Sequence, residues 1–294
     1  MNDIVLFCKS YNIDIVRLSR LWKSIIKHNK NLIPFFVSVP SKDLDFFKKN
    51  IFRSSEINWI KDEDIVDVSP GGSKKRYETM NGGISQQIIK AEFWRLESCK
   101  SYLCLDSDCK FIRDFSTKDF LTENGTPYTV IHQHKEFIQL ALNRGKKKVY
   151  SNTLTDMRKV KDYMERKGVD YDFGPTPVIW HKAPWDDLYQ HELYPNGLTL
   201  WDAITKIPNE MKWYGESLLK NRSIELYPIE PLMRVYHYYW DYKILKKFGE
   251  NEEKLSLNYL GVIYQSNWEY ETLPDSEKKS TSSLIVKKIK RLLA

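Results

Sequence analysis

The chain has 294 residues, of which 41% are hydrophobic and 29% are charged, and its formal net charge is +7. This length allows one large α/β domain or two smaller ones, and the composition is typical of a soluble globular protein. The positive charge comes without zinc-finger spacing, a ribonucleoprotein motif or basic heptads, which argues against nucleic acid as a partner.

The first half of the chain alternates between strand and helix patterns. Apolar runs predict strands at 3–8, 32–39, 57–60, 65–68 and 102–105. Apolar residues at helical spacing predict helices at 14–28, 41–49 and 84–98, and glycines with charged residues predict a loop at 70–83. This order is typical of a parallel sheet covered by helices, in which ligands bind beyond the carboxyl ends of the strands.

The second half of the chain is less regular, and it contains no internal repeat. We predict a basic loop at 146–150, a strand at 177–181 and extended segments at 224–227, 235–239 and 259–265. Helices are predicted at 156–167, 185–191, 198–205 and 212–219. No apolar run has the length that crosses a bilayer and no signal peptide precedes the first strand, so we expect a cytoplasmic protein.

Two aspartates, Asp106 and Asp108, directly follow the apolar strand at 102–105. Burying an unpaired carboxylate is costly, so two of them at a strand end require a compensating charge. A divalent cation that bridges to a phosphate supplies such a charge, because oxygen ligands suit Mg²⁺ and Mn²⁺. The alternative is that both carboxylates are solvated or cap the following turn.

Further polar residues lie near this strand end. Lys9-Ser10-Tyr11 follows the first predicted strand, so it can face the same crevice as the two aspartates. Gln86, Gln87 and Lys90 lie near the start of the helix at 84–98, where amides and a cation can meet a polar ligand or form a solvated helix face.

The strand ending in Asp106-Ser107-Asp108, preceded by Gln86-Gln87-Ile88-Ile89-Lys90, resembles the donor-binding half of a GT-A-type glycosyltransferase. The order of the motifs is similar to that of a little-characterised family of bacterial glycosyltransferase-like proteins found with capsule and lipopolysaccharide genes. The other motifs that carry this resemblance are Lys9-Ser10-Tyr11, Thr176-Pro177 and the segment 213–216, and the whole resemblance spans residues 4–265.

The resemblance implies an α/β fold with a GT-A-like, Rossmann-type mixed sheet flanked by helices. It implies a single catalytic domain at 1–272, with a nucleotide-sugar half at 1–130 and an acceptor half at 131–272. Residues 273–294 are expected to form a polar linker and a basic amphipathic tail.

The resemblance also implies a bound divalent metal, Mn²⁺ or Mg²⁺. Carried over, Asp108 is a direct metal ligand, and Asp106 supports it by contacting the ribose or a metal-bound water. His237 is the candidate third ligand, with a purely structural histidine as the alternative. The residues expected to bind the nucleotide-sugar donor are Lys9, Ser10, Tyr11, Gln86, Gln87, Lys90 and Asp106.

Residues of the second half are expected to face the acceptor. His132 and His134 alternate along the chain, so they can share one face and contribute to the acceptor groove or to the metal site. Thr176 and Trp213 are assigned to the acceptor side by the resemblance.

The expected chemistry is displacement of a nucleotide at an anomeric carbon. A divalent ion and a cation such as Lys9 or Lys90 can stabilise the leaving diphosphate. An inverting enzyme also needs a carboxylate base, for which Glu216 is the first candidate and Asp241 the second. Glu216 can instead favour only the positive end of a helix, and a retaining enzyme needs no such base.

The segment 284–293 places apolar residues on one helical face and lysine and arginine on much of the rest. This pattern fits an interfacial helix on the anionic inner face of the cytoplasmic membrane, or a helix docked on the protein or on a partner.

We therefore expect a metal-dependent glycosyltransferase. Its donor is a nucleotide sugar, and its acceptor is a glycan or a lipid-linked precursor of a bacterial capsule or lipopolysaccharide. The alternatives are a nucleotidyl- or sugar-phosphate transferase of related fold and a non-catalytic carbohydrate-binding protein.

Overall fold

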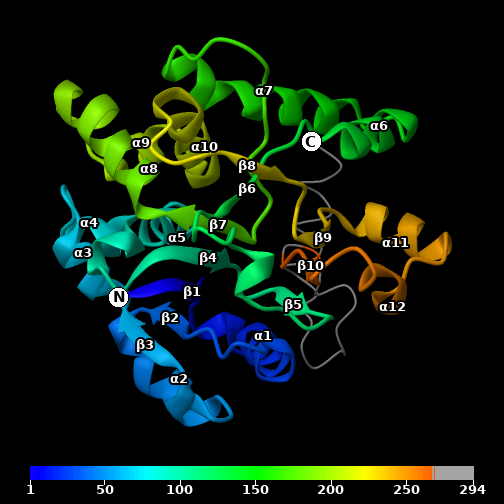
Figure 1. Ribbon diagram of the computed structural model, residues 1–294, viewed down its shortest axis with the longest axis horizontal. Coiled ribbons are helices and arrows are strands. Elements are labelled where there is room, and N and C mark those ends of the chain that lie inside the picture. Colours follow the sequence, from blue (N-terminus) through cyan, green and yellow to red (C-terminus); the bar gives the residue numbers. More distant parts are fainter. Residues whose placement is uncertain (267, 269–294) are drawn as a thin grey trace.

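The computed structural model describes residues 1–266 and residue 268. At its centre lies a five-stranded sheet (Figure 1). Four strands are parallel and the last, at one edge, is antiparallel to its neighbour. The predicted α/β class, with a mixed sheet flanked by helices, is confirmed. The strand order is β3 (Asn58–Lys61), β2 (Phe35–Val39), β1 (Asn2–Lys9), β4 (Cys99–Leu105) and β7 (Val178–His181).

The two central strands are buried on both faces. In β1 the residues from Ile4 to Lys9 are buried, and in β4 those from Ser101 to Leu105 are buried. A parallel strand that is covered on both faces appears in the sequence as a continuous apolar run. This explains why both strands were predicted within two or three residues of their observed bounds.

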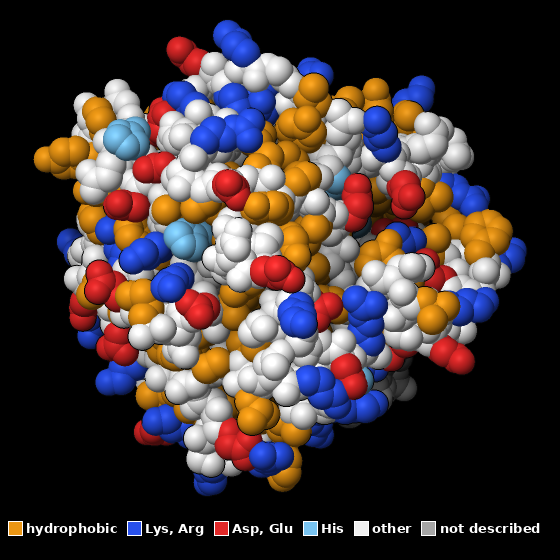
Figure 2. Space-filling view, viewed as in Figure 1, with side chains coloured by type: hydrophobic (Ala, Val, Ile, Leu, Met, Phe, Trp, Pro, Cys, Tyr) orange, Lys and Arg blue, Asp and Glu red, His pale blue; other side chains and the backbone are white. Residues whose placement is uncertain are grey.

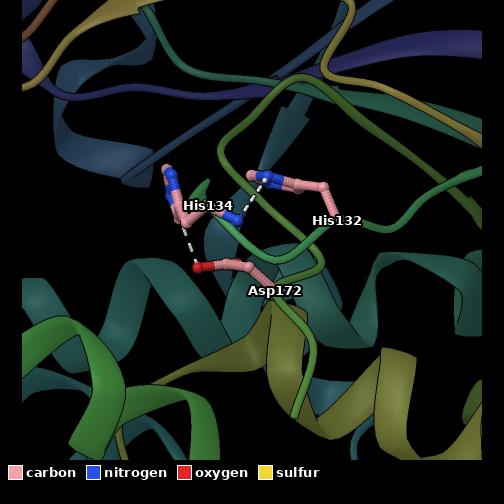
Figure 3. A group of neighbouring side chains, drawn as sticks. All are labelled: His132, His134 and Asp172. Atoms are coloured by element: carbon pink, nitrogen blue, oxygen red, sulfur yellow. Dashed lines mark hydrogen bonds and ion pairs between the residues drawn. The ribbon is translucent and has the colours of Figure 1, made fainter. Parts of the chain in front are cut away.

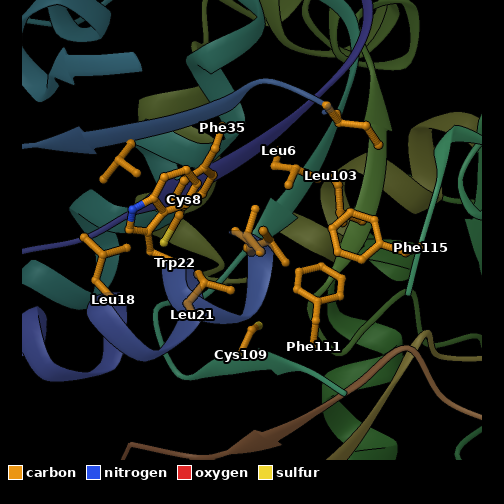
Figure 4. Close-up of a cluster of buried hydrophobic side chains, with 14 of the residues drawn as sticks. Leu6, Cys8, Leu18, Leu21, Trp22, Phe35, Leu103, Cys109, Phe111 and Phe115 are labelled. Atoms are coloured by element: carbon orange, nitrogen blue, oxygen red, sulfur yellow. The ribbon is translucent and has the colours of Figure 1, made fainter. Parts of the chain in front are cut away.

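One face of the sheet is covered by α1 (Ile15–His28) and α2 (Leu44–Asn50). Figure 4 shows Leu18, Leu21 and Trp22 of α1 packing toward the side chains of the sheet. Leu18 precedes Leu21 by three positions and Trp22 by four, so all three lie on one side of the helix. Fully burying an apolar side chain of this size contributes roughly 1.5–3 kcal/mol.

The opposite face is covered by a larger group of helices. Its core contains four tryptophans with almost no exposed surface, Trp180, Trp185, Trp201 and Trp213. The helices on this side are α3 (Asp62–Val68), α4 (Lys74–Thr79), α5 (Gly82–Glu92), α8 (Lys182–Asp187), α9 (Leu200–Lys206) and α10 (Glu210–Asn221).

A second, three-stranded sheet joins segments that are far apart in the sequence. Its order is β5 (Cys109–Phe111), β10 (Gly261–Tyr264) and β9 (Met233–Tyr236). β10 is antiparallel to β5 and parallel to β9. Because β5 begins one residue after Asp108, this sheet connects the two predicted metal-binding aspartates to the second half of the chain.

The remaining elements surround this small sheet. Two short strands, β6 (Tyr128–Val130) and β8 (Tyr227–Ile229), pair in parallel. The helical hairpin of α6 (Lys135–Asn143) and α7 (Lys147–Tyr163) lies on the opposite side of the molecule from α1 and α2 (Figure 1). The last helices are α11 (Tyr239–Lys247) and α12 (Glu252–Leu255). Among the described residues, no helix combines the length and the apolar character needed to span a membrane.

The predicted strand at 65–68 is wrong, because these residues belong to α3. A short apolar run does not by itself distinguish a strand from a buried helix. Here Asp62 and Glu63 favour the positive helix N-terminus, and the carboxylate of Asp64 accepts the backbone N–H of Lys61 at 3.1 Å.

Three further boundaries need correction. The predicted basic loop at 146–150 is mostly the first turn of α7, and the predicted loop at 70–83 contains α4. The extended segment predicted at 235–239 ends at Tyr236, because Tyr239 already begins α11. The predicted tail at 273–294 lies outside the described residues.

The close approach of α10 to the segment before β7 provides a test of the packing. A Cβ atom added at Gly215 would lie 2.0 Å from the ring of Phe173, so Gly215→Ala must displace that ring. Overpacking of this kind costs about 1–3 kcal/mol. We expect the urea midpoint of unfolding to fall accordingly.

Gly82→Ala is the matched control, because a Cβ atom at Gly82 meets nothing within 4 Å and the residue opens a helix. We expect it to leave the stability unchanged or to raise it by roughly 0.5 kcal/mol. Equal stability of the two variants would contradict the observed packing of Gly215.

Candidate functional site

The candidate site begins at the carboxyl end of β4, where Asp106 follows the last strand residue. β7 runs antiparallel to β4 and pairs Val178 with Cys104, so the segment entering β7 passes beside Asp106. The hydroxyl of Thr176 donates a hydrogen bond to Asp106 Oδ2, and the ammonium of Lys90 forms an ion pair with Asp106 Oδ1. The structure thus brings together three of the predicted site residues.

Asp106 is held ionised in this setting. Burial raises its pKa, but the Lys90 ammonium and the hydrogen bonds from Lys90 and Thr176 outweigh burial and lower the pKa below its usual value. The Asp106 side chain nevertheless keeps 32% of its surface exposed, whereas that of Lys90 keeps 4%. Asp106 is therefore an oriented carboxylate with one accessible side.

A second buried carboxylate faces the same lysine. Glu210, at the start of α10, lies 3.7 Å from Lys90 Nζ and is almost fully buried. Burial raises the pKa of Glu210, opposed by the charge of Lys90. The pKa of Lys90 itself lies well above its usual value, because the attraction of Asp106 and Glu210 outweighs its burial. Lys90 is therefore a fixed positive charge between two acids.

Asp108 lies across a tight turn from Asp106. Its carboxylate oxygen Oδ2 accepts the backbone N–H of Ser266 at 2.9 Å, two residues after the end of β10. Its backbone carbonyl accepts a hydrogen bond from Arg20 of α1 at 3.4 Å. Asp108 is 7% exposed, so this carboxylate sits between the two sheets and is not solvated.

His237 lies at the same end of the small sheet as Asp108. In that sheet Ile263 of β10 pairs with Cys109 of β5 on one side and with Val235 of β9 on the other. Asp108 precedes Cys109 and His237 follows β9, so β10 lies between the strands that carry the two residues.

His132 and His134 lie near His237. The ring centroids of His132 and His134 are 4.5 Å apart, and those of His134 and His237 are 5.5 Å apart. Figure 3 shows the first two rings with Asp172, whose Oδ2 lies 3.5 Å from His134 Nε2. Burial lowers the pKa of His134 to about 4 and that of His237 to about 3, so both imidazoles are neutral at pH 7.

These histidines line a cavity of about 890 Å³. Its walls come from the segment before α6, from α6 itself, from β9 and from α11. The lining includes His132, His134, Lys135, Phe137, Leu140, Tyr171, Pro175, Glu230, Arg234, His237, Asp241 and Tyr259. Pro175 is next to Thr176, which connects one wall of the cavity to Asp106.

The structure does not bring Lys9 to this group. Its ammonium lies 2.7 Å from Asp62 Oδ2, and its side chain is 6% exposed. Asp62 also accepts hydrogen bonds from Ser38 and Tyr77, so Lys9 serves to neutralise a buried carboxylate. Ser10 is likewise buried, whereas Tyr11 is 43% exposed.

The remaining predicted residues on the donor and acceptor sides differ in how accessible they are. Gln86 and Gln87 are half-buried near the start of α5. Trp213 is fully buried, and its indole N–H donates to the carbonyl of Ile207 at 3.0 Å. Trp213 is therefore a core residue, and its assignment to the acceptor side does not hold in this structure.

The first candidate base, Glu216, is inaccessible. It lies in the middle of α10, with none of its side chain exposed, and both of its oxygens are held by the guanidinium of Arg166. Glu216 was expected near the start of a helix, and this prediction is wrong because α10 begins six residues earlier, at Glu210. Glu216 stabilises the packing of α10 against the end of α7.

The second candidate base, Asp241, lines the cavity but has a structural task. Its carboxylate accepts the backbone N–H groups of His237, Tyr238 and Tyr242, at 3.0, 3.1 and 2.6 Å. It therefore caps the N-terminus of α11. Burial raises the pKa of Asp241 to about 6, against the lowering effect of these hydrogen bonds.

Asp172, Lys212 and Glu210 were not predicted. Each is a charged residue that no motif distinguishes, and each is buried or half-buried in the fold. The ammonium of Lys212 lies 2.7 Å from Asp172 Oδ1. Only the fold brings these residues together, since α10 and the segment before β7 are far apart in sequence.

A model of a protein family described as a family of unknown function (DUF6492) matches residues 3–243 of this chain. Among solved structures, the crystal structure of mouse xyloside xylosyltransferase 1 in its apo form is similar, with 10% sequence identity and a TM-score of 0.48. That similarity covers 90% of this chain and 98% of the mouse chain. A search of curated proteins finds no match.

The buried pair of Arg166 and Glu216 can be tested for a structural role. Arg166→Met leaves the Glu216 carboxylate buried without its partner, which costs about 3–5 kcal/mol. We expect a loss of that size in the free energy of unfolding, measured by urea denaturation at pH 7.

The double variant Arg166→Met/Glu216→Leu removes both charges, and we expect it to recover most of the lost stability. A double variant as unstable as the single one would contradict the assignment of Glu216 to packing.

Proposed function

This chain belongs to the family of unknown function DUF6492, and on that premise we propose that it is a metal-dependent glycosyltransferase. It moves a sugar from a nucleotide-sugar donor to a glycan or lipid-linked acceptor. The observation that carries the proposal is the carboxylate of Asp106, oriented at a strand end by Lys90 and Thr176. Asp108 follows Asp106 across a tight turn, and Pro175, beside Thr176, lines the cavity that contains the neutral histidines.

The electrostatics of Asp106 support a donor-binding role. Ligands of such sheets bind beyond the carboxyl ends of the parallel strands, which is where Asp106 lies. Each carboxylate oxygen has two lone pairs, so the bonds to Lys90 and Thr176 leave capacity for a ribose hydroxyl. The exposed side of Asp106 is the side from which such a ligand would approach.

We assign the divalent ion of this proposal to Asp108, Asp106 and His237. Asp108 offers a carboxylate and His237 a neutral imidazole, and Asp106 supports the site from the strand end. Imidazole and carboxylate together favour Mn²⁺ over Mg²⁺. When bound, the ion supplies a positive charge for the leaving diphosphate.

The chain's own residues complete the proposed site. Lys90 keeps Asp106 ionised and fixed, and the cavity receives the acceptor beside Thr176 and the histidines. Glu216 has no access to this cavity, so it does not supply the base of an inverting reaction. Lys9 neutralises Asp62, and Lys90 is held between Asp106 and Glu210, which leaves the stabilisation of the diphosphate to the ion.

The proposed acceptor is a precursor of a bacterial surface glycan, such as a capsule or lipopolysaccharide. The motif resemblance supports this class, and so does the charge next to the cavity. The hairpin of α6 and α7, residues 135–163, contains eight Lys or Arg and three Asp or Glu. Figure 2 shows Lys and Arg side chains gathered over α7. This surface suits a phosphate-bearing acceptor or the inner face of the cytoplasmic membrane.

Loss of Asp108 tests the proposed activity. We expect a panel of nucleotide sugars to contain at least one donor that the protein hydrolyses slowly in the presence of Mn²⁺. Asp108→Ala should lower that rate about 100-fold or more, because several kcal/mol of charge stabilisation are lost. The measurement is release of the nucleoside diphosphate, with and without EDTA.

Asp67→Ala is the control, since Asp67 is exposed at the end of α3 and far from the strand end in the fold. Hydrolysis that persists in Asp108→Ala or in EDTA would exclude the metal role. Metal-dependent binding of a nucleotide sugar without any turnover would favour a carbohydrate-binding protein instead.

Removing the hydrogen bond from Thr176 tests whether it orients Asp106. Thr176→Val removes the hydroxyl and keeps the shape, so the carboxylate loses one of its two fixed partners. We expect kcat/KM for the donor to fall about tenfold, which corresponds to about 1.4 kcal/mol.

Thr205→Val is the matched control, because that hydroxyl donates only to the carbonyl of Trp201 within α9. Equal kcat/KM values for the two variants would contradict the orienting role of Thr176.

A further inference from the structure

We propose that His132, His134 and Asp172 bind a divalent transition-metal ion in the wall of the cavity, apart from the ion proposed at Asp108. One atom of each residue is available as a ligand, and these three atoms all lie within 4.8 Å of one another. This site does not depend on the proposed glycosyl transfer, because it rests on three other residues and on their own partners.

The backbone fixes the two segments that carry the ligands. The N–H of His132 donates to the carbonyl of Asp172 at 3.0 Å, and the N–H of Asp172 donates back to the carbonyl of His132 at 2.8 Å. Two residues that exchange both hydrogen bonds in this way are held at a defined separation. The ligand group is therefore supported by the fold and does not depend on surface side chains.

The ring of His132 is oriented as metal-binding imidazoles usually are. Its Nε2 contacts the carbonyl of Gly174 at 2.5 Å, so Nε2 carries the proton and Nδ1 keeps its lone pair. Nδ1 faces the backbone N–H of His134 at 3.2 Å (Figure 3). This long hydrogen bond is the one contact that an ion on Nδ1 would replace.

The two oxygens of the Asp172 carboxylate, like the two ring nitrogens of His132, have different partners. Its Oδ1 is held by Lys212 Nζ at 2.7 Å and by the N–H of Gly174 at 2.9 Å. Its Oδ2 is left to face His134 Nε2 at 3.5 Å. Ligating carboxylates are commonly fixed through their second oxygen in this way. The nearby ammonium of Lys212 repels a cation, so we expect affinity in the micromolar range and not tighter.

His134 occupies an unusual backbone position. It has a φ of +57°, in the left-handed region, immediately before α6. A residue other than glycine in this region stores some strain, and such residues gather at functional sites. The position directs a histidine, and not a small residue, into the space beside Asp172 and His132.

The donor set indicates the class of metal. Two imidazole nitrogens and one carboxylate oxygen suit Zn²⁺, Co²⁺, Fe²⁺ or Mn²⁺, whereas Mg²⁺ and Ca²⁺ prefer oxygen ligands alone. Three protein ligands also leave a coordination position open. Because His132 and His134 line the cavity, water or a bound molecule can reach an open position on their side.

Cobalt titration of the full chain tests this site. Co²⁺ in a site with imidazole ligands gives visible absorption, so the wild-type protein should show a saturable band, which Zn²⁺ displaces and to which this site contributes one equivalent. His134→Asn and Asp172→Asn should each weaken Co²⁺ binding at least tenfold. Asparagine tolerates the left-handed backbone at position 134 and keeps the shape of Asp172.

Two controls separate this site from the others. Asp108→Ala should keep the cobalt band while losing donor hydrolysis, so failure of the proposed function and failure of this site are distinguishable. His191→Asn, which removes an exposed histidine on another surface, should leave the band unchanged. The folded state of each variant is checked by its urea midpoint.

A band of undiminished intensity in both His134→Asn and Asp172→Asn would overturn the site, and so would the absence of any saturable band in the wild-type protein. Loss of the band in Asp108→Ala with its retention in His134→Asn would assign the cobalt to the other site. Lys212→Gln removes the repelling charge and should tighten Co²⁺ binding if the site is correct, which gives a result in the opposite direction from the other variants.

Discussion

The buried ion pair between Lys90 and Asp106 is the interaction on which the site depends. Lys90 belongs to α5, Asp106 follows β4, and Glu210 on α10 provides the second acid. Removing one partner would leave an uncompensated charge in the interior, which is among the most costly changes in a protein. The same pair also holds the segment before β7 in place through Thr176. One electrostatic contact therefore fixes a helix, a strand end and the wall of the cavity together.

The small sheet extends this constraint to the second half of the chain. β10 lies between β5, which directly follows Asp108, and β9, which leads into His237. The N–H of Ser266 closes the arrangement by donating to Asp108. Residues separated by more than a hundred positions are thereby held at one end of one sheet. Local sequence patterns contain no information about this pairing, because strand order is set by packing and hydrogen bonding across the whole fold.

The sequence predicted those parts of the site that belong to regular, buried elements. β1 and β4 were identified because strands covered on both faces are apolar throughout. Of the polar residues at their ends, Asp106 meets Lys90 and Thr176, whereas Lys9 pairs with Asp62. Glu216 and Trp213 were misjudged because a helical pattern does not reveal which residues of α10 face the interior. Asp172 was missed because nothing in the local sequence distinguishes it from other aspartates, and only the fold brings it next to His132 and His134.

The buried lysines on either side of Thr176 are both paired with acids. Lys90 is held by Asp106 and Glu210, and Lys212 is held by Asp172. Asp106 and Asp172 thus each have one oxygen committed to a lysine, which keeps the carboxylate ionised. An ionised carboxylate beside neutral imidazoles attracts cations. Lys90 and Lys212 offset the cost of burying these carboxylates, and their positive charges oppose the binding of a cation next to them.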